Sequence, residues 1–318
     1  MNLIRSSFAV PGPLTRCAPA VRREALGWLL AALAALATLA GCAVLTPQVV
    51  YETPSMFGPL VVTEDGGGLR SMRFGRTGIT QSTIKVGEPE YLRFDYLRLA
   101  LIGMALLPPQ TGAPRRVLLV GLGGGALPVF LHRHYPALQI DVVEIVPEVV
   151  TAAERYFGFR QDARMRAQVG DGRRFIERAQ PAHYDIIILD AFGSAEVPAH
   201  LTTQEFLQAV RRALNINGVV VSNVWNARYN SKYDAMLRTY QEVFPEVHVI
   251  DTSREVNSML FSLPQAASLG YDQFFALARQ HTVQQRYPFD LGELVERGYL
   301  PAPRRNDAPV LRDAAPLK

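Results

Sequence analysis

Three acidic residues, Glu144, Asp171 and Asp190, each follow a stretch that reads as a β-strand. A carboxylate in such a position can accept hydrogen bonds from a bound nucleoside or take a proton from a reacting group. We expect Glu144 to bind ribose hydroxyls, Asp171 to accept from the exocyclic amine of adenine, and Asp190 to lie at the reacting end. Alternatively, each acid caps a helix or forms a turn, which is the commoner role of an Asp after a strand.

A glycine-rich loop precedes the first of these acids. It contains four glycines within five residues: Gly121, Gly123, Gly124 and Gly125. The apolar run 117–120 predicts a buried strand before the loop, and 126–134 predicts a helix whose first N–H groups face any ligand above the glycines. Together with a second strand that leads to Glu144, this order is typical of a nucleoside-binding half-site. A tight turn without a ligand is the alternative interpretation.

The elements that must position these residues alternate between strands and helices. Strands are expected at 117–120, 139–143, 165–169, 184–189, 219–222 and 247–250, and helices at 126–134, 147–157, 173–179, 203–214 and 233–243. Residues 215–218 are expected to form a turn, and 258–262 to close the sheet. This alternation predicts a doubly wound, mostly parallel α/β sheet, in which the carboxyl ends of the strands form the ligand crevice.

A small β-appendage is expected ahead of this sheet, over residues 48–85. Two short strands, 59–63 and 69–74, flank a glycine-rich turn, and an extended piece ends near Gln81. Residues 90–107 predict a helix that packs on the sheet. We therefore divide the chain into an N-terminal segment (1–47), the appendage (48–85), a Rossmann-like catalytic domain (86–300) and a disordered tail (301–318).

The N-terminal segment has the pattern of an export signal. Residues 25–45 carry no charge, follow Arg22 and Arg23, and include a small-residue stretch that ends at Cys42. The pattern predicts either a lipoprotein signal that is acylated at Cys42 or an uncleaved membrane anchor. In both cases the folded domain lies outside the cytoplasm, in the cell envelope. If the true start lies further along the chain, the protein is cytoplasmic.

Composition excludes several classes of protein. The 318 residues are 48% hydrophobic and 19% charged, which is typical of a globular domain. Of the net charge of +4, residues 1–41 supply three through four arginines and one glutamate, so the folded part has no bias toward nucleic acid. Only two cysteines occur, Cys17 and Cys42, both in the N-terminal segment. A disulfide framework or a cysteine-rich metal site is therefore excluded, and no metal is expected.

Four motifs in a fixed order are more specific evidence for a protein family than the glycine loop alone. VLLVGLGGGALP, DVVEIVPEVVTAAERYF, VGDGRRFI and YDIIILDAFGSAEVPAHLTTQEFLQAVRRALNINGVVVSNVW resemble the successive motifs of the spermidine synthase family. The resemblance covers roughly residues 50–261. It implies a Rossmann-like, methyltransferase-type fold and the transfer of an aminopropyl group from decarboxylated S-adenosylmethionine to a small amine such as putrescine, with no metal.

The resemblance also assigns roles to single residues. Asp190 is implied as the acid that binds and deprotonates the attacking amine, and Gln81 as a residue over the donor. The adenosine of the donor would be held by Gly121, Gly123, Gly125, Glu144, Asp171 and Gly172. The expected partners are the amine acceptor, the membrane at the N-terminal segment and, as an open expectation, a second copy of the chain in a homodimer.

Two departures from the family pattern leave alternatives open. Gly124 stands where the family has an Asp that pairs with the aminopropyl ammonium, and Gly193 where a second Asp contacts the acceptor; Glu196 is a candidate substitute. Loss of two carboxylates weakens the case for a dicationic acceptor. The alternatives are a methyltransferase that uses S-adenosylmethionine and a non-catalytic envelope module that binds a nucleoside or polyamine. Trp225 and Tyr229 either border the acceptor site or pack elsewhere.

Overall fold

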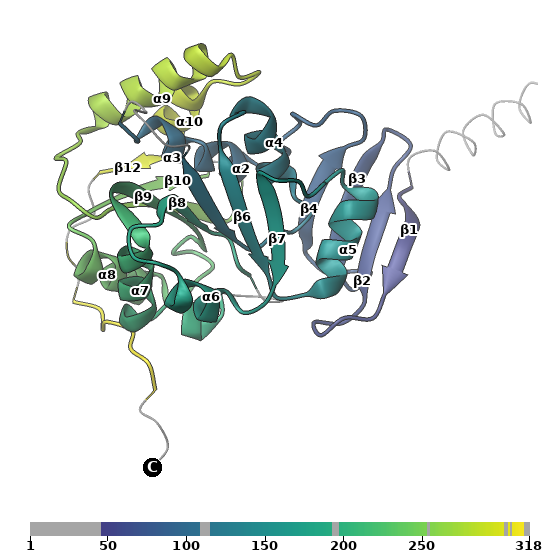
Figure 1. Ribbon diagram of the computed structural model, residues 1–318, viewed down its shortest axis with the longest axis horizontal. Helices are drawn as coiled ribbons and strands as arrows, with labels where there is room; N and C mark the ends of the chain where they lie inside the picture. The colour runs from purple at the N-terminus through teal and green to yellow at the C-terminus, as the bar shows by residue number, and fades with distance from the viewer. Residues whose placement is uncertain are drawn as a thin grey trace, which may run out of the picture. The chain divides into compact units, whose positions relative to one another are not determined.

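An eight-stranded sheet forms the centre of the molecule, as the computed structural model in Figure 1 shows. The structure describes residues 46–108, 115–192, 197–252, 255–301, 305 and 307–314. The strand order is β12-β10-β11-β9-β8-β5-β6-β7. The bounds are β5 (Arg116–Val120), β6 (Gln139–Glu144), β7 (Met165–Val169), β8 (Tyr184–Leu189), β9 (Leu214–Trp225), β10 (Glu246–Asp251), β11 (Asn257–Leu263) and β12 (Tyr299–Leu300).

Strands β7, β6, β5, β8 and β9 pair in parallel, which confirms the predicted doubly wound sheet. The expectation that 258–262 closes the sheet is wrong. Strand β11 lies between β9 and β10 and is antiparallel to both. All seven of its residues are buried, and a strand that is buried along its whole length needs a neighbour on each side and cover on both faces.

Helices cover both faces of the sheet. Their bounds are α2 (Asp95–Ala100), α3 (Ile102–Ala105), α4 (Ala126–His134), α5 (Pro147–Tyr156), α6 (Gly172–Arg178), η1 (Ala199–Leu201), α7 (Gln204–Ala213), α8 (Tyr233–Val243), α9 (Tyr271–Gln285) and α10 (Leu291–Gly298). Because side chains alternate along a strand, Val117 and Leu119 of β5 pack with α4 and α5, whereas Leu118 and Val120 pack with α6 to α8. Each such buried side chain contributes about 1.5–3 kcal/mol.

Two predicted elements differ from the structure for identifiable reasons. The helix expected over 90–107 is divided into α2 and α3, and α2 begins only at Asp95. Its first N–H groups are capped by Glu255, 160 residues further along the chain, so no local cap marks the start. The turn expected at 215–218 belongs to β9 instead. There Asn215 donates a hydrogen bond to Asp185 of β8 (2.8 Å), and the pairing of the two strands is shifted at this point.

The N-terminal appendage is a four-stranded antiparallel sheet. Its strands are β1 (Gln48–Thr53), β2 (Leu60–Glu64), β3 (Leu69–Phe74) and β4 (Thr80–Lys85), in the order β1-β2-β3-β4. The predicted hairpin is β2 and β3, and β1 is an addition that we did not expect. Leu60 and Met72 are fully buried in the same core as α4 and α5, so the small sheet is fixed against the catalytic domain.

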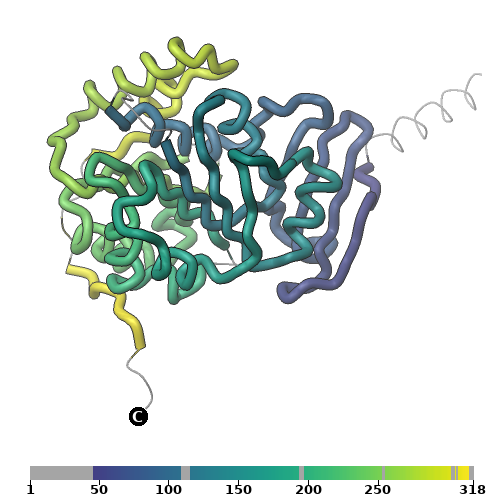
Figure 2. Tube along the Cα trace, viewed as in Figure 1, coloured from purple at the N-terminus to yellow at the C-terminus, as the bar shows by residue number. Residues whose placement is uncertain are grey.

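The C-terminal segment follows helices α9 and α10, which the sequence patterns had not identified. Within the tail expected to be disordered, Leu311 donates to Thr239 of α8 (2.9 Å) and accepts from Gln204 at the start of α7 (2.8 Å). Figure 2 shows this last yellow segment beside α7 and α8.

No helix in the described ranges has the length and apolarity to cross a membrane. Of the predicted signal or anchor (1–47), residues 1–45 lie outside those ranges.

Candidate active site

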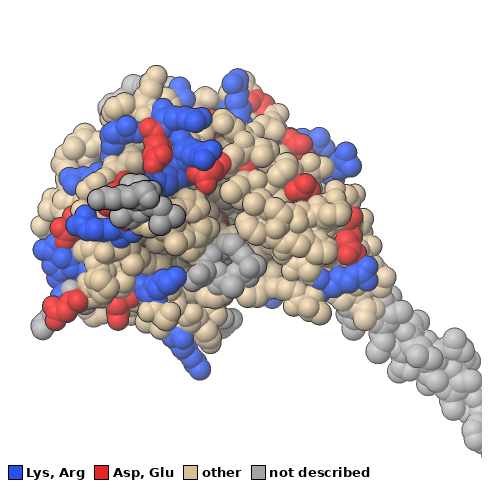
Figure 3. Space-filling model, turned by 90° about the horizontal axis from the view of Figure 1, so that it is seen from below, with Lys and Arg blue, Asp and Glu red and all other residues tan. Residues whose placement is uncertain are grey.

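A cavity of 310 Å³ opens at the carboxyl ends of β5, β6 and β8, a volume typical of small-molecule sites. Viewed from this end, the surface around a central hollow carries mainly uncharged side chains (Figure 3). Seven of the eight predicted site residues line the cavity: Gln81, Gly121, Gly123, Glu144, Asp171, Gly172 and Asp190. Gly125 does not line it, and instead lies at the start of α4 in a left-handed conformation.

Gly121 links the glycine loop to the strand that carries Asp190. Its φ is 102°, and a Cβ atom there would lie 2.2 Å from the carbonyl oxygen of Asp190. Its N–H donates to the carbonyl of Val143 (2.8 Å), and the N–H of Asp190 donates to the carbonyl of Val120 (2.9 Å). Only glycine permits this approach of two backbones, so the loop and the predicted catalytic residue have a fixed relative position.

Gly124 is enclosed by side chains and has no room for a larger residue. A Cβ atom at this position would lie 2.6 Å from the ring of Phe157 and 2.6 Å from the hydroxyl of Ser82. The acid that the resemblance implies for this loop therefore cannot be added without displacing both neighbours. The packing around Gly124 therefore leaves no space for a carboxylate side chain at this position.

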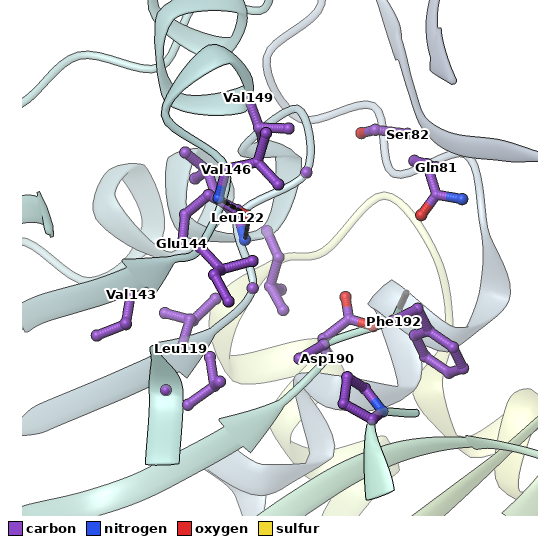
Figure 4. A pocket seen from close by; sticks show the side chains of 18 of the residues that line it. Gln81, Ser82, Leu119, Leu122, Val143, Glu144, Val146, Val149, Asp190 and Phe192 are labelled. Carbon is purple, nitrogen blue, oxygen red and sulfur yellow. Dashed lines mark hydrogen bonds between the residues drawn. The ribbon is translucent and has the colours of Figure 1, made fainter. Parts of the chain in front are cut away.

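Glu144 is buried, with 8% of its surface exposed, and it holds the glycine loop. Its Oε2 accepts from the N–H of Leu122 (2.9 Å) and its Oε1 accepts from the N–H of Val146 (2.9 Å) (Figure 4). Burial raises the pKa of Glu144, and these backbone hydrogen bonds act in the opposite direction. Backbone N–H groups of Ile145 and Gly123 also act on this carboxyl group, and binding of ribose hydroxyls stays the prediction for this residue.

Asp171 lines the cavity and also caps α6. Its Oδ1 accepts from the N–H of Arg174 (2.8 Å), and its Oδ2 lies 3.0 Å from Nε2 of His200. Burial raises the pKa of Asp171, but the bonds to Arg174 and His200 outweigh burial and the net pKa is lowered. The interpretation as a helix cap therefore holds, and His200 is placed on the wall of the same cavity.

Asp190 directly follows β8, and Figure 4 shows its carboxyl group directed into the space between the glycine loop and Gln81. Burial raises its pKa to about 7, assisted by the charge of Glu144 and opposed by a hydrogen bond from Asn223. That bond runs from Nδ2 of Asn223 to Oδ1 (2.8 Å). Within the described ranges no residue donates to Oδ2. One oxygen is thus fixed and the other is free to take a proton.

A chain of buried amides holds Asp190, and sequence reasoning missed it. Asn257 donates to Oδ1 of Asn223 (2.8 Å), which in turn donates to Asp190. Asn223 and Asn257 are 4% and 8% exposed. They come from the neighbouring strands β9 and β11, and only the register of these strands brings them together. No motif in the sequence marks either residue.

A second cavity of 470 Å³ adjoins the first. Gln81, Tyr96 and Phe192 line both cavities, so these three residues form the junction. Trp225 and Tyr229 line the second cavity, which agrees with the hypothesis that they border an acceptor site. Glu255, which the sequence analysis did not single out, is the acid that lines this cavity in the described part of the chain. The predicted substitute acid Glu196, together with Gly193, lies outside the described residues.

The charges around the first cavity restrict its ligands. Glu144, Asp171 and Asp190 line it, whereas none of its described lining residues is Lys or Arg. Across the described ranges, no group of three or more His, Cys, Asp or Glu is arranged to hold a metal ion. The arrangement suits a nucleoside whose other end is cationic.

Comparison with known proteins gives a consistent result. Residues 99–255 match the spermine/spermidine synthase domain. The chain is 35% identical over 244 residues to the polyamine aminopropyltransferase of Vibrio vulnificus, covering 72% of this chain and 79% of that protein. A probable spermidine synthase from Corynebacterium glutamicum has the same fold, with a TM-score of 0.68, 22% identity, and coverage of 86% of this chain and 99% of that one.

A methyltransferase is also similar. Human methyltransferase-like protein 13, solved in complex with SAH, superimposes with a TM-score of 0.55 at 32% identity. The match covers 61% of this chain and 93% of the human one. The predicted Rossmann-like, methyltransferase-type fold is therefore confirmed. The chain is thus similar both to aminopropyltransferases and to a methyltransferase-like protein.

Proposed function

The chain belongs to the spermine/spermidine synthase family, and we propose that it transfers an aminopropyl group from decarboxylated S-adenosylmethionine to an amine. The observation that carries the choice of donor is the charge of the first cavity, which three carboxylates line without any Lys or Arg among the described residues. S-adenosylmethionine ends in an amino acid, whose carboxylate the acids of this cavity would repel even though they attract its ammonium group. The decarboxylated donor ends in an ammonium group, which the same charges attract.

The two cavities and Asp190 supply the parts that the reaction needs. An alkylamine is protonated at neutral pH and must lose a proton before its nitrogen can attack. Asp190, whose Oδ2 accepts no hydrogen bond from the described residues and whose pKa is raised to about 7, takes that proton. The nitrogen then forms a bond to the carbon next to the sulfonium, and the electron pair of the breaking C–S bond goes to sulfur. The products are the extended amine and the neutral thioether methylthioadenosine.

The protein positions the two substrates from opposite sides of the junction. The glycine loop and Glu144 hold the adenosine end of the donor in the first cavity, and the amine enters the second. Gln81 and Tyr96, which line both cavities, lie at the point where they meet. The amides of Asn223 and Asn257 fix the orientation of the Asp190 carboxyl group.

Methyl transfer from S-adenosylmethionine is the second candidate. Two observations favour it: Gly124 supplies no acid for an aminopropyl ammonium, and a human methyltransferase-like protein bound to SAH is 32% identical. The same base would then deprotonate the acceptor. The difference between the candidates lies in the donor alone.

Calorimetric titration of the full chain with methylthioadenosine and with SAH tests the choice of donor. Methylthioadenosine lacks the charged amino-acid end, so we expect it to bind more tightly, by roughly 10-fold or more, because a carboxylate without a cationic partner is costly in such a cavity. Tighter binding of SAH would favour methyl transfer. Binding of neither thioether would remove both candidates.

For the N-terminal segment we propose a lipoprotein signal or anchor that places the domain in the cell envelope. The support is the uncharged stretch 25–45 behind Arg22 and Arg23, which includes small residues directly before Cys42. Labelling with a radioactive fatty acid should mark the protein, and Cys42→Ser should abolish the label. An unlabelled chain in the cytoplasm would contradict the proposed signal.

We also propose a homodimer. Light scattering of the purified chain tests it, because a homodimer requires the mass of two chains.

A further inference from the structure

The first turn of α6 carries an arginine that the proposed reaction does not use. Arg173 follows Asp171 by two residues and does not itself line the first cavity. Its Nη1 donates to Oδ1 of Asp313 (2.7 Å), and its Nη2 donates to Oδ2 of the same carboxylate. A bidentate pair of this kind fixes the plane and direction of the guanidinium group, which a single contact does not.

Asp313 belongs to the C-terminal segment, residues 307–314, which is itself bound to the domain. Both backbone groups of Leu311 are hydrogen-bonded, one to α8 and one to the start of α7. The N–H of Asp313 donates to Oε2 of Glu205 in the first turn of α7 (3.0 Å). The hydrogen bond from Arg173 lowers the pKa of Asp313, so this carboxylate is charged at neutral pH.

Arg173 also contacts the wall of the first cavity. Its Nη1 donates to the carbonyl of His200 (3.1 Å) and lies 3.4 Å from Oγ1 of Thr203, the N-cap of α7. His200 belongs to η1 and lines the cavity, as does Asp171 at the start of α6. One guanidinium group therefore joins the two elements that carry His200 and Asp171.

The side chains of His200 and Asp171 are bound to each other on the cavity side. Oδ2 of Asp171 lies 3.0 Å from Nε2 of His200, and Oδ1 accepts from the N–H of Arg174 (2.8 Å). One contact on each oxygen sets the orientation of the carboxylate. Its remaining lone pairs can accept from the exocyclic amine of adenine only in that orientation. A shift of η1 would turn the carboxylate through His200.

Building on the proposed function, we propose that Arg173 and Asp313 are positioning residues of the donor site, through which the C-terminal segment orients His200 and Asp171 for the adenine base. Neither Arg173 nor Asp313 lines the cavity, so both act through other residues. The alternative is that the ion pair only fastens the end of the chain, since ion pairs near the surface contribute little by themselves.

The test compares two thioethers that differ only in the base. In methylthioinosine an oxygen replaces the exocyclic amine of methylthioadenosine. For the full chain, calorimetry should show tighter binding of methylthioadenosine by roughly 10- to 100-fold, the effect of one hydrogen bond to a charged group. In Asp313→Asn this preference should fall by roughly 3- to 10-fold, because Arg173 loses the bidentate partner that directs it to His200. Affinity for methylthioinosine should stay unchanged.

Glu242→Gln is the matched control. Glu242 of α8 also pairs with arginines, Arg238 and Arg305, and its side chain is 31% exposed, close to the 35% of Asp313. Its removal breaks a similar ion pair away from the cavity and should keep the preference for methylthioadenosine. Asp313→Glu retains a carboxylate for Arg173 and should restore the preference that Asp313→Asn loses.

An equal loss of affinity for both thioethers in Asp313→Asn would show that the segment only stabilises the domain, and would overturn the proposal. An unchanged preference, or an unmodified chain that does not distinguish the two bases, would overturn it too. Arg173→Lys serves if Asp313→Asn does not fold. Lysine keeps a charge beside Glu177 but lacks the planar fork, so the preference should again fall. A retained preference would contradict the proposal.

Failure of the proposed function has a different signature. If the unmodified chain binds neither methylthioadenosine nor SAH, the proposed donor site is wrong, and hydrogen exchange tests the positioning role alone. The amides of Leu201 in η1 and Arg174 in α6 are both hydrogen-bonded and report on the two elements. Their exchange should become several-fold faster in Asp313→Asn and stay unchanged in Glu242→Gln. Equal exchange in the two variants would overturn the positioning role itself.

Discussion

Replacement of Asp190 by Asn should strongly reduce the rate of transfer and, at the same time, stabilise the folded chain at neutral and higher pH. Asn keeps the shape of the side chain and an oxygen that accepts from Asn223, but it cannot take a proton. The rate of transfer should fall by about 10²–10⁴, the usual contribution of a positioned acid–base group. A residue that only formed a turn would show the reverse: lower stability with turnover per folded molecule retained.

The gain in stability follows from the pKa of the Asp190 carboxyl group. In the unfolded chain the pKa is 3.8, and in the folded chain burial raises it to about 7. The folded state therefore holds the proton more tightly. The stabilisation that this provides is complete below the unfolded pKa and is lost as the pH rises through the folded pKa, a loss of up to about 4 kcal/mol. Asn cannot ionise and does not suffer this loss.

Urea unfolding of both proteins across a pH series measures the effect. We expect the difference in the free energy of unfolding, in favour of Asp190→Asn, to grow by about 3 kcal/mol between pH 5 and pH 8. In the unmodified chain kcat/KM should rise with pH around 7, since the base must be ionised to act. A difference in stability that does not change with pH, or a folded Asp190→Asn protein with full activity, would refute the reasoning.

Three further changes test the surroundings of Asp190. Gly124→Asp should lower donor affinity and destabilise the chain by about 1–3 kcal/mol, because a Cβ atom would lie 2.6 Å from Phe157; higher activity in a transfer assay would contradict this. Glu144→Ala should weaken calorimetric binding of methylthioadenosine by roughly 1–3 kcal/mol, with unchanged affinity in a folded variant as the contrary result. Asn223→Leu removes the donor that lowers the pKa of Asp190, so the pH–rate profile should move to higher pH by on the order of one unit; an unmoved profile would show that the amide has no such role.

Local sequence signals identified the elements around the donor cavity correctly. The helix over 126–134 has the predicted bounds because a glycine in a left-handed conformation begins it. Asp190 follows β8 because the apolar run 186–189 stops there, and Glu144 is the last residue of β6, which was predicted to lead to it. Parallel strands of a doubly wound sheet bring their carboxyl ends together, so these acids were predictable as a group.

Features that depend on pairing between distant segments were not predictable. Asn223 and Asn257 lie on adjacent strands only because β11 is inserted between β9 and β10, which the order of the segments in the sequence does not reveal. Glu255 acts on α2 across 160 residues. Asn215 and Gly218 are common turn residues, and they lie in the irregular part of β9, where its pairing with β8 is shifted and Asn215 donates to Asp185. In each case tertiary contacts decide what the local sequence leaves open.

The claim that the chain moves an aminopropyl group is tested most directly by a competition between donors. The full chain is supplied with S-adenosylmethionine and its decarboxylated form at equal concentration, together with a linear diamine, and the amine products are identified by mass spectrometry. We predict a diamine extended by one aminopropyl group, with an equal amount of methylthioadenosine. A methylated diamine accompanied by SAH, with no aminopropyl product, would contradict the account.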